Sequence, residues 1–233
     1  MNIILTGGTR GIGFATTIHL LEAGHNLAIN YLNSDKIAKD IKNRFPNNFI
    51  YAKGSISNIE ADRDLIEKTL KAFGSIDCLI NNASIGLYGL MTTNIDEDIK
   101  ATILTNITGT IMITQLVIPH LLKTKGQIIN ISSIWGNKGA SCETIYAMTK
   151  GAINQMTTSL ARELGPCGVR VNTISPGLIN TQMNDDLELK YFIEEIPLKR
   201  MGEGIEVAKL VEFLLNSTYI NGTNIIIDGG YSI

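Results

Sequence analysis

Short apolar runs alternate along the chain with longer segments in which apolar residues recur every three or four positions. The short runs predict strands at residues 2–5, 27–30, 49–53, 76–80, 127–131, 169–174 and 224–227. The longer segments predict helices at residues 14–23, 34–45, 59–73, 96–122, 143–164 and 205–216. Strands that alternate with helices form parallel sheets with helices on both faces. We therefore expect a single α/β domain over residues 1–233, with a doubly wound parallel sheet of about seven strands.

Two stretches fit this pattern less simply. Residues 96–122 form the longest helical pattern, and Pro119 predicts that the helix ends nearby. Residues 178–204 show no clear period. Their larger apolar side chains are Met183, Leu187, Tyr191, Phe192 and Ile196. This composition indicates either a mobile lid with an apolar inner side or a packed pair of helices, and the sequence leaves both open.

Composition narrows the class of protein. Hydrophobic residues make up 44% of the 233 residues and prolines number only 5, which is typical of a folded globular chain. The net charge of −2, without any basic run, argues against a nucleic-acid partner bound through its phosphates. The 3 histidines show no metal-ligand spacing, so we expect no metal site.

The cysteines and the N-terminus bear on location. Cys78, Cys142 and Cys167 are few, odd in number and without a spacing pattern, which indicates free thiols in a reducing compartment. The first predicted strand begins at Asn2 and leaves no room for a signal peptide. The most apolar stretch, residues 109–122, is too short and too polar to span a bilayer. We expect a cytoplasmic protein without a membrane partner.

A glycine-rich turn separates the first strand from the first helix. It comprises Gly7, Gly8, Thr9, Arg10, Gly11, Ile12 and Gly13, with the glycine spacing Gly-x-x-x-Gly-x-Gly. Glycines let the backbone approach a ligand closely, and the start of a helix presents unpaired N–H groups with partial positive charge. Between a strand and a helix, such a turn predicts a phosphate-binding site.

Three further residues form a candidate catalytic group. Tyr146 and Lys150 lie four positions apart on one predicted helix and so share a face. Ser133 follows the strand at residues 127–131. A neighbouring ammonium should lower the phenol pKa, ordinarily about 10, and the serine hydroxyl should hold a carbonyl oxygen. The group predicts proton transfer to a carbonyl, although a tyrosine–lysine pair by itself is also common on solvated helix faces.

These features all follow strand ends. The glycine-rich turn, Asn82, Ser133 and Pro176 each come just after a predicted strand. The carboxyl ends of parallel strands meet at one edge of a sheet, and ligands bind beyond that edge. We therefore expect the phosphate site and the catalytic group to share one cleft.

Taken in order, the motifs resemble those of the short-chain dehydrogenase/reductase family over essentially the whole chain. The matching positions are Thr6-Gly7-x-x-x-Gly11-x-Gly13, Asn81-Asn82-Ala83, Asn106, Ser133, Tyr146-x-x-x-Lys150, Pro176-Gly177 and Asp228-Gly229-Gly230. The resemblance implies a Rossmann-type fold and a nicotinamide cofactor.

The resemblance also implies a role for each catalytic position. Tyr146 would be the acid/base, Lys150 would hold the nicotinamide ribose, and Ser133 would orient the substrate carbonyl. Asn106 would hold a water that supplies protons through Lys150. The alternative for Asn106 is a buried helix asparagine that bonds to the backbone.

Further cofactor contacts are implied in the same way. They involve Ser55 and Ile56 beside the adenine, Asn82 and Ala83 at the floor of the cleft, and Pro176, Gly177, Ile179 and Thr181 along the nicotinamide. Two positions depart from the family pattern. Ser84 stands where glycine is usual, and Ser55 stands where aspartate is usual, which puts the adenine contacts in question but not the chemistry.

The residues after the second strand bear on the choice of cofactor. NAD-binding chains of this fold place a carboxylate there for the ribose 2′-hydroxyl, but residues 30–34 contain none, and Asp35 is expected at the start of the next helix. Arg10 lies in the glycine-rich turn, where a guanidinium can pair with a 2′-phosphate. We therefore expect NADPH, with a solvated Arg10 as the alternative.

The substrate and the assembly are implied by the branch of the family that the chain resembles. Arg10 and the ending Gly222-x-x-Ile225-x-x-Asp228-Gly229-Gly230 resemble the 3-oxoacyl-(acyl-carrier-protein) reductase branch, which implies a carrier-tethered 3-oxoacyl thioester, fatty-acid synthesis and a homotetramer or dimer. Residues 132–143 depart from that branch and resemble reductases of a ketone on a modified lysine of elongation factor P. A reductase of a polyketide-like pathway and a catalytically silent NADP-binding sensor or structural subunit stay open.

Overall fold

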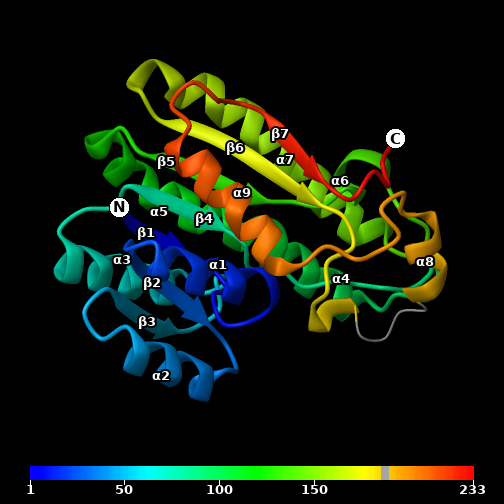
Figure 1. Cartoon of the computed structure of the whole chain (residues 1–233), viewed down its shortest axis with the longest axis horizontal. Helices are drawn as coiled ribbons and strands as arrows, with labels where there is room; N and C mark the ends of the chain where they lie inside the picture. The colour runs from blue at the N-terminus through cyan, green and yellow to red at the C-terminus, as the bar shows by residue number, and fades with distance from the viewer. Residues whose placement is uncertain (185–188) are drawn as a thin grey trace.

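Strands that pair in parallel form one seven-stranded sheet within residues 1–184 and 189–233, which the computed structural model describes (Figure 1). The strands are β1 (Asn2–Leu5), β2 (Asn26–Tyr31), β3 (Phe49–Lys53), β4 (Cys78–Asn81), β5 (Gln127–Ile131), β6 (Arg170–Pro176) and β7 (Asn224–Ile227). Their order in the sheet is β3-β2-β1-β4-β5-β6-β7, so the direction of winding reverses between β1 and β4. The predicted doubly wound sheet is confirmed.

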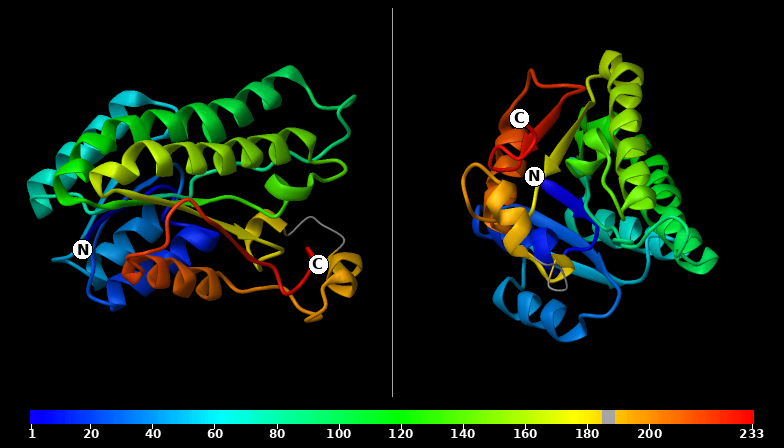
Figure 2. Two further views of the ribbon diagram at one scale, coloured as in Figure 1. Left: turned by 90° about the horizontal axis from the view of Figure 1, so that it is seen from above. Right: turned by 90° about the vertical axis from the view of Figure 1, so that its right-hand side faces the viewer.

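Helices cover both faces of this sheet (Figure 2). The α-helices are α1 (Gly11–Glu22), α2 (Asp35–Arg44), α3 (Ile59–Phe73), α4 (Asp96–Ile103), α5 (Thr110–Thr124), α6 (Trp135–Lys138), α7 (Thr144–Leu164), α8 (Leu189–Glu195) and α9 (Gly204–Asn216). Shorter turns are η1 (Leu104–Gly109), η2 (Gly165–Cys167) and η3 (Gln182–Asn184). One apolar cluster joins the sheet to α1, α2 and α9, and a second joins it to α3, α5 and α7.

Alternate side chains of each strand serve the two faces. In β1, Ile3 and Leu5 belong to the first cluster and Ile4 to the second, and all three are fully buried. Side chains of a strand point to opposite faces in turn, so a strand that is covered on both sides reads as a continuous apolar run. This is why the strands could be located from the sequence without any alternation of polar residues.

Helix α5 passes through Pro119 and ends close to residue 122, where the predicted helix ended. Helix α5 contains Pro119 and continues to Thr124, where Lys125 adopts the left-handed conformation with a φ of 50°. A proline inside a helix costs about 3 kcal/mol, because one main-chain hydrogen bond is lost and the ring crowds the preceding turn. The neighbouring Val117 and Leu121 are fully buried against the sheet, and each contributes roughly 2 kcal/mol by burial. Their packing outweighs the proline.

The long helical segment is also interrupted earlier, by the π-helical turn η1 around Asn106. The Asn106 side chain accepts a hydrogen bond from the Ile85 N–H at 2.9 Å and donates one to the Ile85 carbonyl at 2.9 Å. A π turn inserts one extra residue into a helix and often lies at a functional site. Here it joins the helix to the loop that follows β4.

In the segment without a clear period, residues 178–204, the described part contains η3 and α8. Ile179 pairs with Gly202 in an isolated parallel bridge, and Ile196 is almost fully buried. Both ends of the segment are thus anchored. Leu187, which the lid prediction included, lies outside the described residues, and the lid role stays a prediction.

One stretch of the described chain, Asp96–Thr124, is apolar and long enough to cross a membrane by length and composition. In the fold, however, this stretch packs its residues Ile113, Val117 and Leu121 into the second apolar cluster. A core helix passes the same test of length and composition, and the packing accounts for the apolar residues here.

Asp62 on α3 is a buried acid whose Oδ2 atom has no hydrogen-bond partner among the described residues. Burial raises its pKa to about 7 from an ordinary value near 4. A carboxyl with a raised folded-state pKa keeps its proton on folding, so stability falls as the pH rises from the unfolded pKa to the folded one.

We predict that Asp62→Asn removes this pH dependence. Relative to the variant, the wild-type protein should lose about 2–3 kcal/mol of unfolding free energy between pH 5 and pH 8, because its carboxyl must ionise in a buried place. Urea unfolding of both proteins at a series of pH values measures the difference. Parallel curves for the two proteins would show that Asp62 does not titrate with a raised pKa.

Candidate active site

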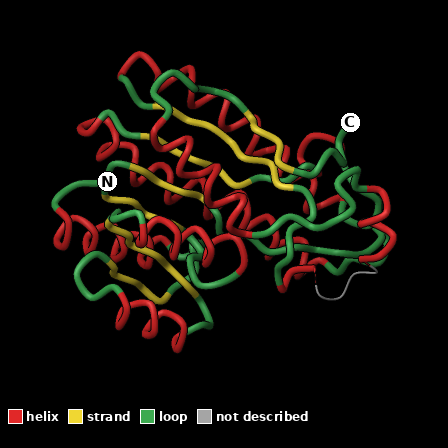
Figure 3. Tube along the Cα trace, viewed as in Figure 1, coloured by secondary structure: helices red, strands yellow, loops and turns green. Residues whose placement is uncertain are grey.

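The loops that follow the strands gather at one end of the sheet (Figure 3), and the glycine-rich turn lies there between β1 and α1. Gly7 and Gly11 have φ angles of 71° and 49°, a left-handed conformation that glycine adopts without strain. A Cβ atom on Gly13 would lie 2.2 Å from the Gly7 carbonyl oxygen, so only glycine allows the helix to start this close to the turn. The first turn of α1 contains no acidic residue. The turn therefore fits a bound diphosphate at the helix N-terminus.

Side chains of β2 and of the residue that follows β4 hold the turn in this shape. The Gly7 N–H donates to Asn30 Oδ1 at 2.7 Å. Asn82 Nδ2 donates to the carbonyl oxygens of Thr6 at 2.9 Å and Gly7 at 3.2 Å. The Thr6 hydroxyl accepts from the N–H groups of Asn82 and Ala83, each at 3.0 Å. Asn82 and Ala83 thus contact the turn, and their predicted contacts with the cofactor stay predictions. The supporting role of Asn30 was not foreseen.

The candidate catalytic residues lie together just after β5 and on α7. Lys150 Nζ lies 5.5 Å from the centre of the Tyr146 ring, and the Ser133 hydroxyl is close enough to the Tyr146 phenol to lower its pKa. Ser133 Oγ also accepts from the Trp135 N–H at 3.2 Å, which fixes its orientation. The sequence placed these three side chains correctly relative to one another.

Two hydrogen bonds dock this part of α7 on β5. Lys150 Nζ donates to the Ile131 carbonyl at 3.0 Å, and Ser132 Oγ donates to the Lys150 carbonyl at 3.0 Å. Ser132 was not assigned any role from the sequence. The available signal was the position of Ser132 directly before Ser133 at the end of β5. Side chains at this edge of the sheet face α7, the helix that packs back against it.

The ionisation of the pair differs from the prediction. Burial raises the pKa of Tyr146, the charge of Glu143 raises it further, and the hydrogen bond with Ser133 lowers it. Burial also lowers the pKa of Lys150 to about 8. The phenol pKa is therefore raised in the chain by itself, whereas the sequence predicted a lowered value, because burial disfavours the charged form of each group. The protein favours a protonated Tyr146, which is the form that can donate a proton.

Asn106 reaches this group through Thr149. Its Nδ2 atom donates to Thr149 Oγ1 at 3.1 Å as well as to Ile85. The side-chain amide is thus committed to protein partners, and the Asn106 carbonyl accepts from the Thr110 hydroxyl at 3.0 Å. The predicted proton supply through a water at Asn106 stays a prediction.

The segment after β6 crosses toward the glycine-rich turn. The Gly177 N–H donates to the Ile227 carbonyl at 2.9 Å, and a Cβ on Gly177 would lie 2.6 Å from Asp228 Cβ. The Thr181 methyl group lies 3.2 Å from the Cβ position of Gly11. Pro176, Gly177 and Thr181 therefore lie at the same edge as the phosphate site. Ile179 is 4% exposed, which leaves little of its side chain for a ligand.

Comparison with known proteins agrees with this geometry. A family model described as enoyl-(acyl carrier protein) reductase matches residues 7–232. The chain is 34% identical to a 3-oxoacyl-(acyl-carrier-protein) reductase FabG of Staphylococcus epidermidis, with 97% of each chain covered. It is 31% identical to carbonyl reductase family member 4 of Danio rerio, with 99% of this chain and 97% of the relative covered.

The chain belongs to the short-chain dehydrogenase/reductase family. Among solved structures, a short-chain dehydrogenase of Burkholderia cenocepacia in complex with NADP is similar, with a TM-score of 0.94, 30% identity and coverage of 100% of this chain and 98% of that one. A second similar structure, ElxO with NADP bound, has a TM-score of 0.91 and 30% identity and is covered to 98%, with 99% of this chain. As a member of this family, the protein is an oxidoreductase that acts on carbonyl or hydroxyl groups with a nicotinamide cofactor.

The adenine side of this reductase departs from the family pattern. Ser55 Oγ accepts from the Ser57 N–H at 3.1 Å and so closes a local turn. Ile56 is 2% exposed, which leaves its main chain rather than its side chain for a cofactor contact. Ser84 is half-buried in the loop that Asn106 holds. The contacts predicted for Ser55 and Ile56 stay predictions.

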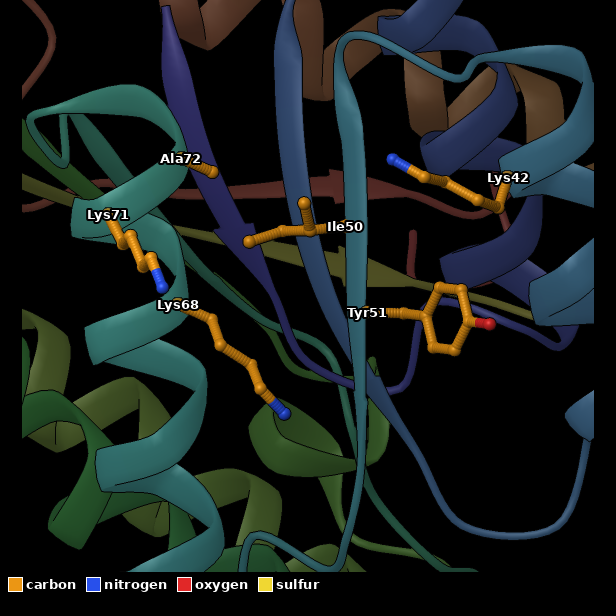
Figure 4. A pocket seen from close by; sticks show the side chains of 6 residues that line it. All are labelled: Lys42, Ile50, Tyr51, Lys68, Lys71 and Ala72. Carbon is orange, nitrogen blue, oxygen red and sulfur yellow. The ribbon is translucent and has the colours of Figure 1, made fainter.

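A separate cavity of about 490 Å³ lies between α2, α3 and β3, far along the sheet from β5 (Figure 4). Its lining residues are Lys42, Ile50, Tyr51, Lys68, Lys71 and Ala72. Lys42 donates to the carbonyls of Pro46 and Phe49, and Lys68 pairs with Asp64. These ammonium groups have protein partners, and we assign the cavity no chemistry. No group of three His, Cys, Asp or Glu side chains suited to a metal occurs in the described part of the chain.

We predict that Tyr146→Phe lowers ketone reduction roughly 100-fold or more, because general acid catalysis contributes about that much. The substitution removes the proton donor but keeps the ring. Steady-state NADPH oxidation measures the loss, and cofactor fluorescence titration should show binding within about threefold of wild type. Tyr219→Phe, at a fully exposed position, is the matched control and should behave as wild type. An active Tyr146→Phe enzyme would mean that another group donates the proton.

Proposed function

We propose that the protein is an NADPH-dependent ketone reductase whose substrate is a 3-oxoacyl thioester. The observation that carries the proposal is the meeting of Ser133, Tyr146 and Lys150 at the sheet edge where the glycine-rich turn lies. The names of the 3-oxoacyl-(acyl-carrier-protein) reductases among its relatives support the thioester. An intact catalytic group supports an enzyme over the silent NADP-binding subunit.

The chemistry divides between the cofactor and the chain. When bound, the reduced nicotinamide supplies a hydride to the ketone carbon. Tyr146 donates its proton to the ketone oxygen, so the carbonyl gains two electrons and two hydrogens and becomes an alcohol. The Ser133 hydroxyl holds the same oxygen and orients the carbonyl. Lys150, whose pKa of about 8 leaves it largely protonated at neutral pH, is the group that would return a proton to Tyr146.

Arg10 supports the choice of NADPH over NADH. Arg10 Nε donates to Ser34 Oγ at 3.0 Å, so the guanidinium lies beside the end of β2. Asp35 is the acid closest in sequence to the end of β2. It accepts a hydrogen bond from the Tyr31 hydroxyl at 2.9 Å and forms an ion pair with Lys53 at 2.8 Å. An arginine beside β2 and an acid already bound elsewhere favour a 2′-phosphate over a free 2′-hydroxyl.

We predict that Arg10→Ala lowers kcat/KM for NADPH about 10- to 100-fold, as expected for one lost charge-assisted hydrogen bond. The value for NADH should change less than about threefold, because NADH has no 2′-phosphate. Arg63→Ala, which removes an exposed arginine of α3, is the control and should leave both values unchanged. A wild-type preference for NADH would contradict the proposed cofactor.

One observation favours a second candidate substrate, the ketone on a modified lysine of elongation factor P. The half-buried carboxyl of Glu143 lies three positions before Tyr146, and its charge acts on the Tyr146 side chain. A lysine-derived substrate would bring an amine that can pair with this acid. A simple acyl chain would bring none.

The proposed function is tested by NADPH oxidation with a panel of acetoacetyl thioesters, small ketones and quinones, with and without an acyl carrier protein. Reduction of the thioesters at the highest kcat/KM is the expected result. A clear preference for a ketone without a thioester would reject the first candidate. Failure to reduce any carbonyl compound would reject the ketone reductase itself.

We also propose a homotetramer formed through the long helices and the sheet edge at β7. Large apolar side chains are exposed there, including Leu104, Ile111, Leu122 and Met148 on the long helical segments and Ile226 on β7. Exposed apolar surface of this extent is typical of contacts between subunits. We predict a tetramer or dimer in light scattering at micromolar concentration. A monomer under these conditions would contradict the proposal.

A further inference from the structure

Glu143 occupies a fixed backbone position at the start of α7. It is the residue before the first helical residue, and its carbonyl accepts from the Ala147 N–H at 2.8 Å. The preceding Cys142 adopts the left-handed conformation with a φ of 63°, and its carbonyl accepts from the Gly89 N–H at 2.7 Å. The loop after β4 and the start of α7 thus hold Glu143 from both sides.

The Glu143 side chain does not cap helix α7. A carboxylate before the first turn of a helix commonly accepts from its free N–H groups, but Glu143 makes no such side-chain bond. No described residue forms an ion pair with it either. A half-buried carboxylate without a hydrogen-bond donor or a cation beside it costs free energy on folding, because burial disfavours its charge. Burial accordingly raises the pKa of Glu143 to about 6.

The acid lies close to the reacting group. Residues three apart at a helix start lie on neighbouring positions of one face, about 5–6 Å apart at their Cβ atoms. Glu143 directly precedes the first residue of α7 and lies three positions before Tyr146, so a carboxylate there disfavours the phenolate and raises the phenol pKa. The Lys150 ammonium, 5.5 Å from the centre of the Tyr146 ring, donates to the Ile131 carbonyl and forms no ion pair with Glu143. The chain therefore places an acid without an ion-pair partner among the described residues beside its proton donor.

A molecule that reaches Tyr146 can supply the missing partner. Ketone reduction itself needs no anion at this position, since the catalytic group already contains a proton donor, a hydroxyl and an ammonium. A positive charge on the substrate, a few bonds from the ketone, would pair with Glu143 and lose little by desolvation, because the acid has already lost part of its water.

We propose that Glu143 is a specificity residue that selects ketones carrying a cationic group, such as an amine, near the carbonyl. The inference rests on the proposed ketone reduction and refines its substrate class. It favours the ketone on a modified lysine over a simple acyl chain, and among 3-oxoacyl thioesters it fits only those whose acyl chain bears an amine.

The test compares two methyl ketones of equal shape. One carries a trimethylammonium group three carbons from the carbonyl, and the other carries a tert-butyl group in its place; neither can cyclise as a primary amine would. The wild-type enzyme should reduce the cationic ketone with a kcat/KM about tenfold higher, a difference of about 1.4 kcal/mol. In Glu143→Gln the ratio of the two values should fall to about one.

Matched variants isolate the charge. Glu143→Asp keeps the acid and should keep part of the preference, and it replaces Glu143→Gln if that variant does not fold. Glu163→Gln removes an exposed acid at the far end of the same helix and should leave the wild-type ratio unchanged. Calorimetric titration of the enzyme–NADP complex with each ketone measures the preference as a ratio of two binding constants. This measurement does not require turnover.

The outcomes separate the two proposals. A wild-type ratio near one, or a ratio that Glu143→Gln leaves intact, overturns the role of Glu143 even if the thioesters are good substrates. Reduction of neither ketone nor any thioester overturns the proposed function, and the binding constants then still decide whether Glu143 selects a cation.

Discussion

The hydrogen bonds between the end of β1 and the end of β4 are the constraint on which the rest of the site depends. The direction of winding reverses between β1 and β4, so the helices on the two sides of this point cover opposite faces of the sheet. In such sheets, ligands bind at this point, beyond the carboxyl ends of the two strands. Asn82 binds the carbonyls of Thr6 and Gly7, and the Thr6 hydroxyl binds the main chain after β4. The shape of the phosphate turn is therefore set by a neighbouring strand.

The catalytic side chains are fixed by the same principle on the other side of the cleft. Helix α7 is bonded to β5 at Lys150 and, further along, through Asn130 Nδ2, which donates to Thr157 Oγ1 at 2.8 Å. Asn81 Nδ2 in turn donates to Asn130 Oδ1 at 2.8 Å and so connects β4 to β5. These buried polar bonds have few alternative partners in an apolar core, so they determine how the helix lies on the sheet. Tyr146 owes its position to that packing.

Burial rather than pairing controls the charges at the site. Burial raises the pKa values of Tyr146 and Glu143 and lowers the pKa of Lys150. In each case the neutral form is stabilised relative to the charged form. A neutral phenol and a largely charged lysine suit a reductase, which must deliver a proton with each hydride. The acid at position 143 has no such part in the reaction, which is why its place next to Tyr146 concerns the substrate.

The sequence by itself determined the strands, most of the helices and the gathering of the motifs at one sheet edge. Apolar runs and helical periods are local, and parallel winding then leaves one edge for the residues that follow each strand. The continuation of α5 through Pro119 and the π turn at Asn106 depended on tertiary structure, because burial on the sheet and a bond to Ile85 outweigh local preference. So did the direction of the Tyr146 pKa shift and the solitary state of Glu143. The pKa shift depends on how much water the folded chain excludes, and the lack of a partner depends on which side chains surround Glu143. Spacing along a helix carries no information about either.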